Sequence, residues 1–128
     1  MSRLIGLLDI YDQDELDNEE ELLYHLLWEG AETCAFEVEQ LDPVGFGAIL
    51  APDGSTTVME AYRDYAEVAQ RALVAHRTRN FDEERVIVMQ GKRLIDGYHH
   101  FMAAANIGRP VMFIDLEKAI EPGLDPAI

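Results

Sequence analysis

The residues best suited to chemistry lie in one short stretch, where a predicted strand meets a predicted helix. Asp96 and Gly97 close an extended segment, and His99 and His100 fall in the first turn of a helix that begins at Tyr98. The first N–H groups of a helix lack internal partners and carry the positive end of the helix dipole, so they favour anions. Gly97 has no Cβ and would let a ligand approach the backbone closely. This junction is therefore a candidate phosphate-binding turn.

Two basic residues precede the junction in the turn of a predicted hairpin, and we expect them to converge with the histidines on a polyphosphate. Asp96 alternatively caps the helix, because Asp is among the best N-cap residues, and Gly97 alternatively only ends the strand. Adjacent helical residues point about 100° apart, so a metal site built on the two histidines is not predicted. His99 is the candidate for phosphate contact or proton transfer. The complete predicted phosphate site is Lys92, Arg93, Asp96, Gly97, His99 and His100.

The apolar pattern around the junction predicts the elements that position it. The run Val86–Met89 is continuously apolar, which is typical of a strand buried on both faces. Gly91 and Lys92 form a tight turn, and Gly108 ends the helix. In order, we expect strand, turn, strand, helix and strand over residues 86–89, 91–92, 93–95, 98–107 and 111–115.

Upstream we expect two short strands that could pair, over residues 36–41 and 46–50, and one long helix over 57–80. Thr57 with Glu60 three residues later is a capping box, and apolar residues recur at helical spacing from Val58 to His76. Residues 4–11 are predicted as a strand and residues 19–29 as a short amphipathic helix. The predicted fold class is α+β, a small mixed sheet with packed helices.

One basic cluster lies at the end of the long predicted helix and comprises Arg71, Arg77, Arg79 and His76. It either binds an anion or simply complements the negative end of the helix dipole.

The 128 residues carry a net charge of −15, which is concentrated in the first third. Such a surface repels bare nucleic acid, because phosphate binding requires cations, and it attracts a basic protein partner. Alternatively the acids only keep the protein soluble. Trp28 either anchors a partner or packs against a neighbouring element. The predicted partner-binding patch is Asp12, Asp14, Glu15, Asp17, Glu19, Glu20, Glu21 and Trp28.

The length fits one domain, and no apolar run reaches the roughly 20 residues that span a bilayer. The apolar stretch after Met1 is too short for a signal peptide. Cys34 is the single cysteine, so an internal disulfide is excluded and Cys34 is interpreted as a small buried residue. A cytoplasmic protein without membrane association is expected.

Residues 94–105, Leu-Ile-Asp-Gly-Tyr-His-His-Phe-Met-Ala-Ala-Ala, with Gly108, Pro110 and the strand to Asp115, resemble the conserved box of the ParB/sulfiredoxin superfamily. The match is strongest over residues 86–115 and looser over 34–115. The segment 36–43 is similar to the family's opening strand. Residues 1–33 have no counterpart and are interpreted as an acidic extension, a strand and short helix packed on a domain of residues 34–128.

The resemblance implies a nucleotide-dependent enzyme or switch whose turn holds the phosphates of ATP or CTP, with magnesium. Carried over, Gly97 gives the close backbone approach and His99 contacts phosphate. His100 stands where the family has an arginine, which is permanently charged and binds phosphate with two donors. Lys92 or Arg93 would compensate. Tyr98 lies next to the place of the sulfiredoxin cysteine, so sulfinic-acid repair is not expected.

The carboxylate for a metal ion or a catalytic base would come from the long helix, at Glu60, Asp64 or Glu67. The alternative function is a non-catalytic acidic inhibitor or adaptor of a phage or plasmid that binds a basic protein, in one version by DNA mimicry. No helix-turn-helix segment is recognisable, which excludes a full partition protein. The oligomeric state is left open.

Overall fold

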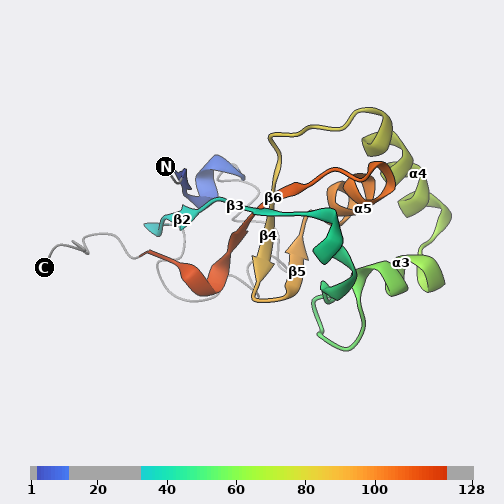
Figure 1. Ribbon diagram of the computed structural model, residues 1–128, viewed down its shortest axis with the longest axis horizontal. Coiled ribbons are helices and arrows are strands. Elements are labelled where there is room, and N and C mark those ends of the chain that lie inside the picture. The colour runs from blue at the N-terminus through green and yellow to red at the C-terminus, as the bar shows by residue number, and fades with distance from the viewer. Residues whose placement is uncertain (1–2, 12–32, 121–128) are drawn as a thin grey trace, which may run out of the picture.

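The computed structural model describes residues 3–11 and 33–120, which form an α+β fold on a four-stranded sheet (Figure 1). The second and third strands of this sheet run parallel to each other, and the outer pairs are antiparallel. A smaller antiparallel sheet pairs β1 (Leu4–Ile5) with β2 (Phe36–Glu37). The order in the larger sheet is β3 (Glu39–Leu41), β6 (Val111–Asp115), β4 (Val86–Gln90) and β5 (Arg93–Asp96).

Three α-helices are described: α3 (Val58–Tyr65), α4 (Val68–Arg79) and α5 (Tyr98–Ile107). Short 3-10 helices occur at η1 (Leu7–Asp9), η3 (Pro43–Ala48) and η4 (Leu116–Lys118). Helix α5 connects β5 to β6 and so supplies the crossover that the parallel pair β4–β6 requires. In Figure 1 the three helices lie to the right of the sheet, with α5 next to it and α4 outside. None of the helices in the described ranges is long and apolar enough to cross a bilayer.

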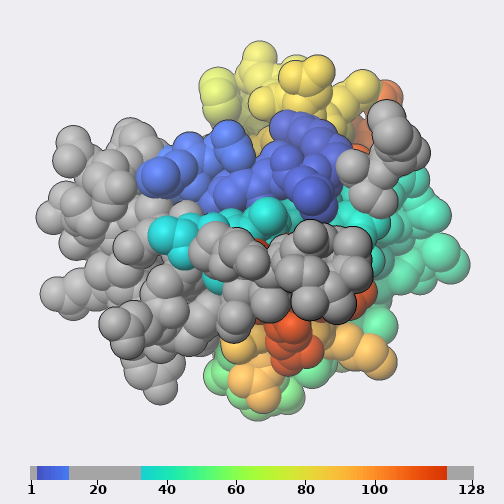
Figure 2. Space-filling view, turned by 90° about the vertical axis from the view of Figure 1, so that its left-hand side faces the viewer, coloured from blue at the N-terminus to red at the C-terminus, as the bar shows by residue number. Residues whose placement is uncertain are grey.

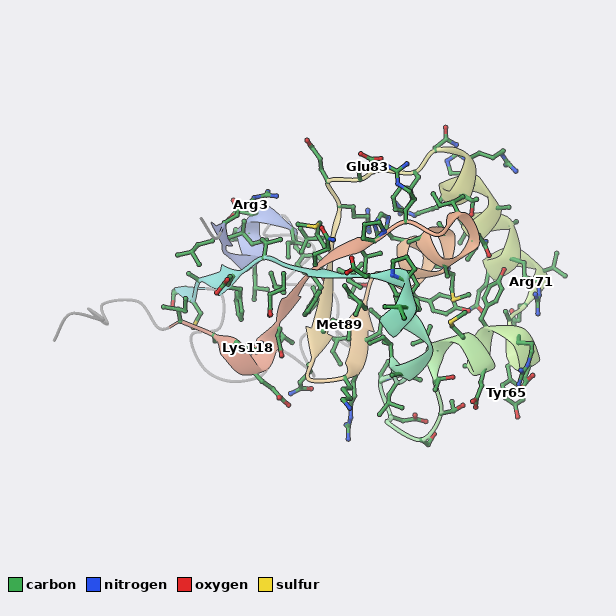
Figure 3. All side chains as sticks on the ribbon, viewed as in Figure 1. Arg3, Tyr65, Arg71, Glu83, Met89 and Lys118 are labelled. Carbon is green, nitrogen blue, oxygen red and sulfur yellow. The ribbon has the colours of Figure 1, made fainter. Side chains whose placement is uncertain are left out.

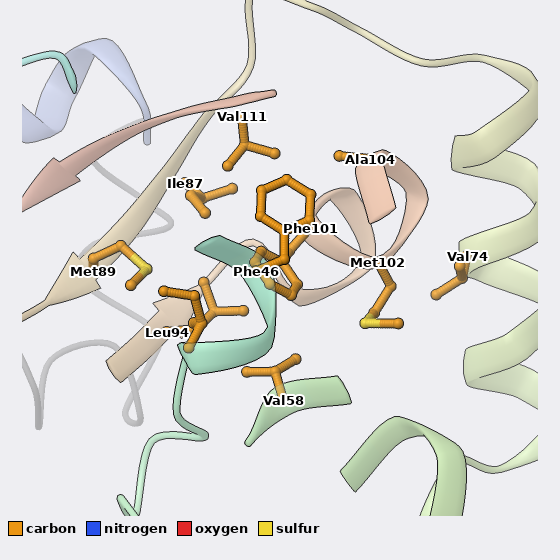
Figure 4. Packing of buried hydrophobic residues seen from close by; sticks show 11 residues of the cluster. Phe46, Val58, Val74, Ile87, Met89, Leu94, Phe101, Met102, Ala104 and Val111 are labelled. Carbon is orange, nitrogen blue, oxygen red and sulfur yellow. The ribbon is translucent and has the colours of Figure 1, made fainter. Parts of the chain in front are cut away.

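Strand β4 is buried on both faces, as its apolar run predicts. Ile87 and Met89 point into a cluster under the helices, and Val88 points into a cluster on the opposite face. The helical side centres on the rings of Phe46 and Phe101, whose centroids lie 4.8 Å apart (Figure 4). Two apolar clusters, one on each face, therefore hold the sheet in place, since apolar burial is the dominant favourable contribution to folding.

The N-terminal segment covers the other face of the sheet. Ile5, Leu7 and Tyr11 are buried there with Phe36, and the amide of Val38 donates to the carbonyl oxygen of residue 3 at 2.8 Å. Figure 2 shows residues 3–11 in blue, against the yellow segment near residue 80 and the cyan segment near residue 36. The described part of the predicted acidic extension thus contributes to the same core as the rest of the chain.

The predicted elements from residue 86 onwards are confirmed. Helix α5 and strand β6 have the predicted bounds, and β4 and β5 each extend one residue further than expected. Gly91 in the turn and Gly108 after α5 both have positive φ, at 60° and 66°. Local signals suffice here because a left-handed residue ends each element and only glycine adopts that conformation without strain.

The single long helix over 57–80 is wrong, because the chain becomes extended at Ala66 and Glu67 and divides α3 from α4. The cap by Thr57 is confirmed, since its hydroxyl accepts from the amide of Glu60 at 3.2 Å. At the break, the guanidinium of Arg71 donates to three carbonyl oxygens at the end of α3, those of Tyr62, Arg63 and Ala66 at 3.1–3.2 Å. These side-chain bonds replace helical ones, so a residue of the next helix caps the end of α3, where the sequence has no glycine or proline.

The break also changes which side chains are buried. Helix α4 starts a new phase that buries Val74 and leaves Leu73 51% exposed, whereas the continuous pattern placed Leu73 on the inner face. Tyr65, the last residue of α3, is 79% exposed for the same reason.

Two predicted strands are also corrected. Residues 46–50 do not form a strand that pairs with 36–41. Pro43 begins η3, which carries Phe46 into the core, and only Leu50 forms isolated bridges, to Thr57 and Arg93. The predicted strand over 4–11 is limited to β1, because the chain turns into η1, whose Asp9 carboxylate accepts from the amide of Gly6 at 2.7 Å. The strand over 36–41 is present but interrupted at Val38.

Candidate functional site

Helix α5 begins with an uncapped, positively polarised turn. Gly97 is its N-cap residue, and the amide of Phe101 makes the first helical bond to the carbonyl oxygen of Gly97 at 2.9 Å. The N–H groups of Tyr98, His99 and His100 precede that bond, and no side chain caps them. The alternative prediction that Asp96 caps α5 is wrong, because its carboxylate accepts a hydrogen bond from the hydroxyl of Tyr11 instead. These three backbone donors at a helix start favour a negative ligand.

The glycine at this turn is required by packing within the chain. Gly97 has a φ of 103°, and a Cβ built on it would lie 2.7 Å from the Cβ of Ile87 in β4. Any other residue would be strained and would also push α5 away from the sheet. The close approach at Gly97 is therefore one between the start of α5 and strand β4.

His100 is buried at the base of the turn. It is 2% exposed and stacks on Phe81, with ring centroids 4.7 Å apart and an interplanar angle of 9°. Its Nε2 atom is enclosed and has no hydrogen-bond partner among the described residues. Burial, and then the charges of Arg85 and Arg77, lower the pKa of His100 to about 4, while Asp82 opposes this shift. His100 is consequently neutral at pH 7.

His99 shares these surroundings. Its ring meets the edge of Tyr98 with centroids 5.2 Å apart, and its Nε2 is likewise enclosed without a partner in the described ranges. Burial lowers the pKa of His99, the charges of Arg77 and Arg85 lower it further, and Asp96 acts in the opposite direction. Two neighbouring imidazoles thus each hold an unused nitrogen beside positive charge.

The positive charge comes from Arg77 in the last turn of α4 and Arg85 directly before β4. Burial and then the charge of Arg85 lower the pKa of Arg77, which means that the two guanidinium groups repel each other. Ion pairs in residues 3–11 and 33–120 join Arg63 to Asp64, Lys118 to Glu39 and Arg109 to Glu83, and neither Arg77 nor Arg85 is among them. We call Arg77, Arg85, His99 and His100 the cationic cluster.

The structure does not bring Lys92 and Arg93 to the histidines. Both lie at the turn end of the β4–β5 hairpin, and β5 separates the nearer one, Arg93, from Gly97 by about 13 Å at the usual strand rise. Figure 3 labels Met89 near that turn and Glu83 near the opposite end of the sheet. The guanidinium of Arg93 instead packs beside Gly54, where a Cβ would come within 3.1 Å of it. Of the predicted phosphate site, residues 96–100 remain together and the two basic residues lie apart.

Arg85 was missed by the sequence analysis, and Arg77 was noted only as part of a basic helix end. The position of Arg85 is set by strand pairing. The register of the hairpin sets Val88 opposite Asp96, so a residue three positions before Val88 must lie beyond the end of β5, beside the start of α5. The contact of Arg77 with the same turn depends on the packing of α4 against α5, which local patterns do not encode.

The carboxylates proposed for a metal ion have other partners. Glu60 accepts from the hydroxyl of Thr56 at 3.1 Å, Asp64 pairs with Arg63 at 2.9 Å, and Glu67 is exposed at the start of α4. Within the described ranges, no three His, Cys, Asp or Glu side chains gather where they could hold a metal ion. The described residues therefore offer no side-chain cluster of their own for a magnesium ion. The predicted acidic patch, residues 12–21 with Trp28, lies outside the described residues.

An apolar cleft of about 490 Å³ adjoins the same turn. Tyr98 forms part of its wall and also touches His99, so the cleft and the cationic cluster meet at the first residues of α5. Burial and the neighbouring Tyr62 raise the pKa of Tyr98, which keeps its hydroxyl protonated. The cleft is lined by Ala51, Pro52, Val58, Ala61, Tyr65, Gln70, Leu94, Ile95 and Tyr98.

No protein-family model, no curated protein and no solved structure matches the chain.

Proposed function

We propose that this chain is a nucleotide-binding domain that holds phosphate groups at the start of α5, between Arg77, Arg85, His99 and the free backbone N–H groups. The single observation that carries the proposal is the cationic cluster itself. Two arginines without an ion pair in the described ranges face an uncapped helix start. Arg77 is half-buried and Arg85 is exposed, and a bound anion would relieve the repulsion between their like charges.

The resemblance to the ParB/sulfiredoxin superfamily supports the same ligand. The family arginine that His100 replaces would have its charge supplied here by Arg77 and Arg85, which come from other elements. Arginine binds phosphate with two donors of fixed geometry. In this proposal Arg77 and Arg85 compensate for the loss of the family arginine at His100. Lys92 and Arg93 are then not needed to bind the phosphates.

The apolar cleft supports a ligand with a base as well as phosphates. Tyr98 borders both the cleft and the cationic cluster, so in the proposal the base lies against Tyr98 and the phosphates extend past His99. A base stacked on an aromatic side chain contributes about 1–3 kcal/mol. The proposed activity is binding; a role in catalysis or as a switch would follow from an acceptor or partner that the nucleotide site serves.

The test is calorimetric titration with ATP, CTP and GTP, with and without magnesium, on the wild-type chain and four matched variants. Arg77→Gln and Arg85→Gln each remove one charge of the cluster. Arg79→Gln removes a charge two residues further along α4, where the side chain is exposed, and Lys92→Gln removes one at the hairpin turn. We expect micromolar binding that falls at least tenfold, about 1.4 kcal/mol, in the first two variants and stays within twofold in the last two.

The contribution of the nucleobase is tested by comparing the affinity for a nucleoside triphosphate with that for inorganic tripolyphosphate. Tyr98→Leu should weaken the nucleotide about tenfold and leave tripolyphosphate unchanged. Equal loss of affinity in Arg77→Gln and Lys92→Gln would refute the cluster as the phosphate site. Absence of binding to all three nucleotides and to tripolyphosphate, with the chain folded, would refute the proposed function.

A further inference from the structure

The two histidines at the start of α5 have an unused capacity to hold protons. Each Nε2 is enclosed and without a partner in the described part of the chain, and His100 is 2% exposed. Burying a polar nitrogen without a hydrogen bond costs about 1–3 kcal/mol. The charges of Arg77 and Arg85 act on both imidazole rings, so an anion bound between these arginines would act on both rings as well.

The charges that face the histidines come from every element packed around them. Helix α4 contributes Arg77, the loop before β4 contributes Asp82 and Arg85, and the end of β5 contributes Asp96. Asp96 is itself engaged by the hydroxyl of Tyr11. Without a ligand, burial and the two arginines together outweigh the two carboxylates, and the imidazoles stay neutral near pH 7.

A bound dianion reverses this balance. Its charge offsets the positive field of Arg77 and Arg85, and it also attracts a protonated imidazole directly. Both effects favour the charged form of histidine. Arg77 and Arg85 cannot serve as the proton acceptors, because guanidinium is already protonated at any pH at which the protein is folded.

We propose that anion binding at the cationic cluster is coupled to uptake of one proton from solvent by the pair His99 and His100, so that the site binds anions more tightly as the pH falls. The inference rests on the proposed phosphate site and adds its regulation. By linkage, one coupled proton makes the affinity rise up to tenfold for each pH unit below neutrality, until the free histidines themselves become charged.

The probe is sulfate, which remains a dianion over the whole range, whereas phosphate titrates near neutral pH. Titrations at pH 5.5, 6.5 and 7.5 are each repeated in two buffers with different ionisation enthalpies, and the difference in observed heat gives the number of protons taken up. We expect uptake of close to one proton per bound sulfate at pH 6.5. The affinity for sulfate should increase three- to tenfold for each pH unit by which the pH is lowered. Sulfate binding with no proton uptake and no pH dependence would overturn the inference and leave the phosphate site standing. No binding of sulfate or of any nucleotide would instead overturn the proposed function.

Two variants assign the proton to the pair. His99→Gln and His100→Gln keep an amide donor but cannot be charged, and His76→Gln is the matched control on the exposed side of α4. Proton uptake should fall in at least one of the two site variants and stay unchanged in the control. Uptake that survives in both would overturn the inference.

A variant at buried His100 could lose stability, so NMR titration of the wild-type histidine C–H signals gives an independent readout. Sulfate should raise the pKa of one imidazole of the pair, and unchanged pKa values would contradict the proposal.

Discussion

The two ends of the β4–β5 hairpin carry similar basic residues in opposite electrostatic settings. At the turn end, the charge of Arg93 acts on Asp53, and the carboxylate of Asp115 accepts from the amides of Gly91 and Glu117, both at 3.0 Å. At the other end, Arg77 and Arg85 repel each other and depress the pKa values of two histidines. Ion pairing therefore distinguishes the two ends: neither Arg77 nor Arg85 takes part in an ion pair within residues 3–11 and 33–120, and the number of cations alone does not set the local potential.

The largest expected effect contrasts the glycines at these two ends. Gly97→Ala combines a positive φ of 103° with a collision against Ile87, whereas Gly91→Ala, at a φ of 60°, meets only the mobile carboxylate of Glu117 at 3.2 Å. We expect a loss of about 3 kcal/mol or more in the free energy of unfolding for Gly97→Ala and about 1 kcal/mol for Gly91→Ala. Urea denaturation measures both, and equal losses would show that the turn at Gly97 can relax.

The second effect concerns pH. The pKa of His100 is about 4 in the folded chain and 6.5 in the unfolded one, so between these values the unfolded chain binds more protons. Folding stability therefore falls as the pH drops from 6.5 to 4, by up to about 3 kcal/mol from this residue. The comparison is the pH dependence of the unfolding free energy in wild type and in His100→Gln, in buffers without sulfate or phosphate. If the two profiles have the same slope below pH 6.5, His100 is protonated without penalty in the folded chain.

At the turn end of the hairpin, the backbone is held by the carboxylate of Asp115. Asp115 is 8% exposed and holds two backbone amides with one oxygen. Asp115→Ala should cost about 2 kcal/mol in unfolding free energy, because both amides lose their acceptor. Asp115→Asn keeps an oxygen and should cost about half as much. Thermal unfolding of the two variants tests this, and a loss of similar size in both would assign the effect to the charge.

The smallest effect tests the link between the N-terminal segment and the site. Tyr11→Phe removes the hydroxyl that donates to Asp96 and should cost about 1 kcal/mol. Tyr65→Phe is the control, because that side chain is 79% exposed and its hydroxyl should contribute nothing measurable. Chemical denaturation separates the two, and an unchanged midpoint for Tyr11→Phe would show that water replaces the hydroxyl at Asp96.

The sequence predicted the second half of the fold better than the first. From residue 86 onwards each element is delimited by a glycine or a proline and is strongly apolar, so local chemistry alone sets its ends. Between residues 42 and 80 the decisive contacts come from individual side chains that the apolar pattern does not single out. The side chain of Arg71 ends α3, and the burial of Phe46 favours a 3-10 helix over a strand. Periodicity cannot register either contact.

The candidate site divides in the same way. The sequence by itself determined the junction at residues 96–100, because a glycine between a strand and a helix start is a local feature with a local physical consequence. Only the tertiary structure decided which cations accompany it. Lys92 and Arg93 are close in sequence but lie at the far end of β5, whereas Arg77 and Arg85 reach the junction through the packing of α4 on α5 and the register of β4 against β5. Electrostatic interactions depend on distance in space, and the fold sets that distance.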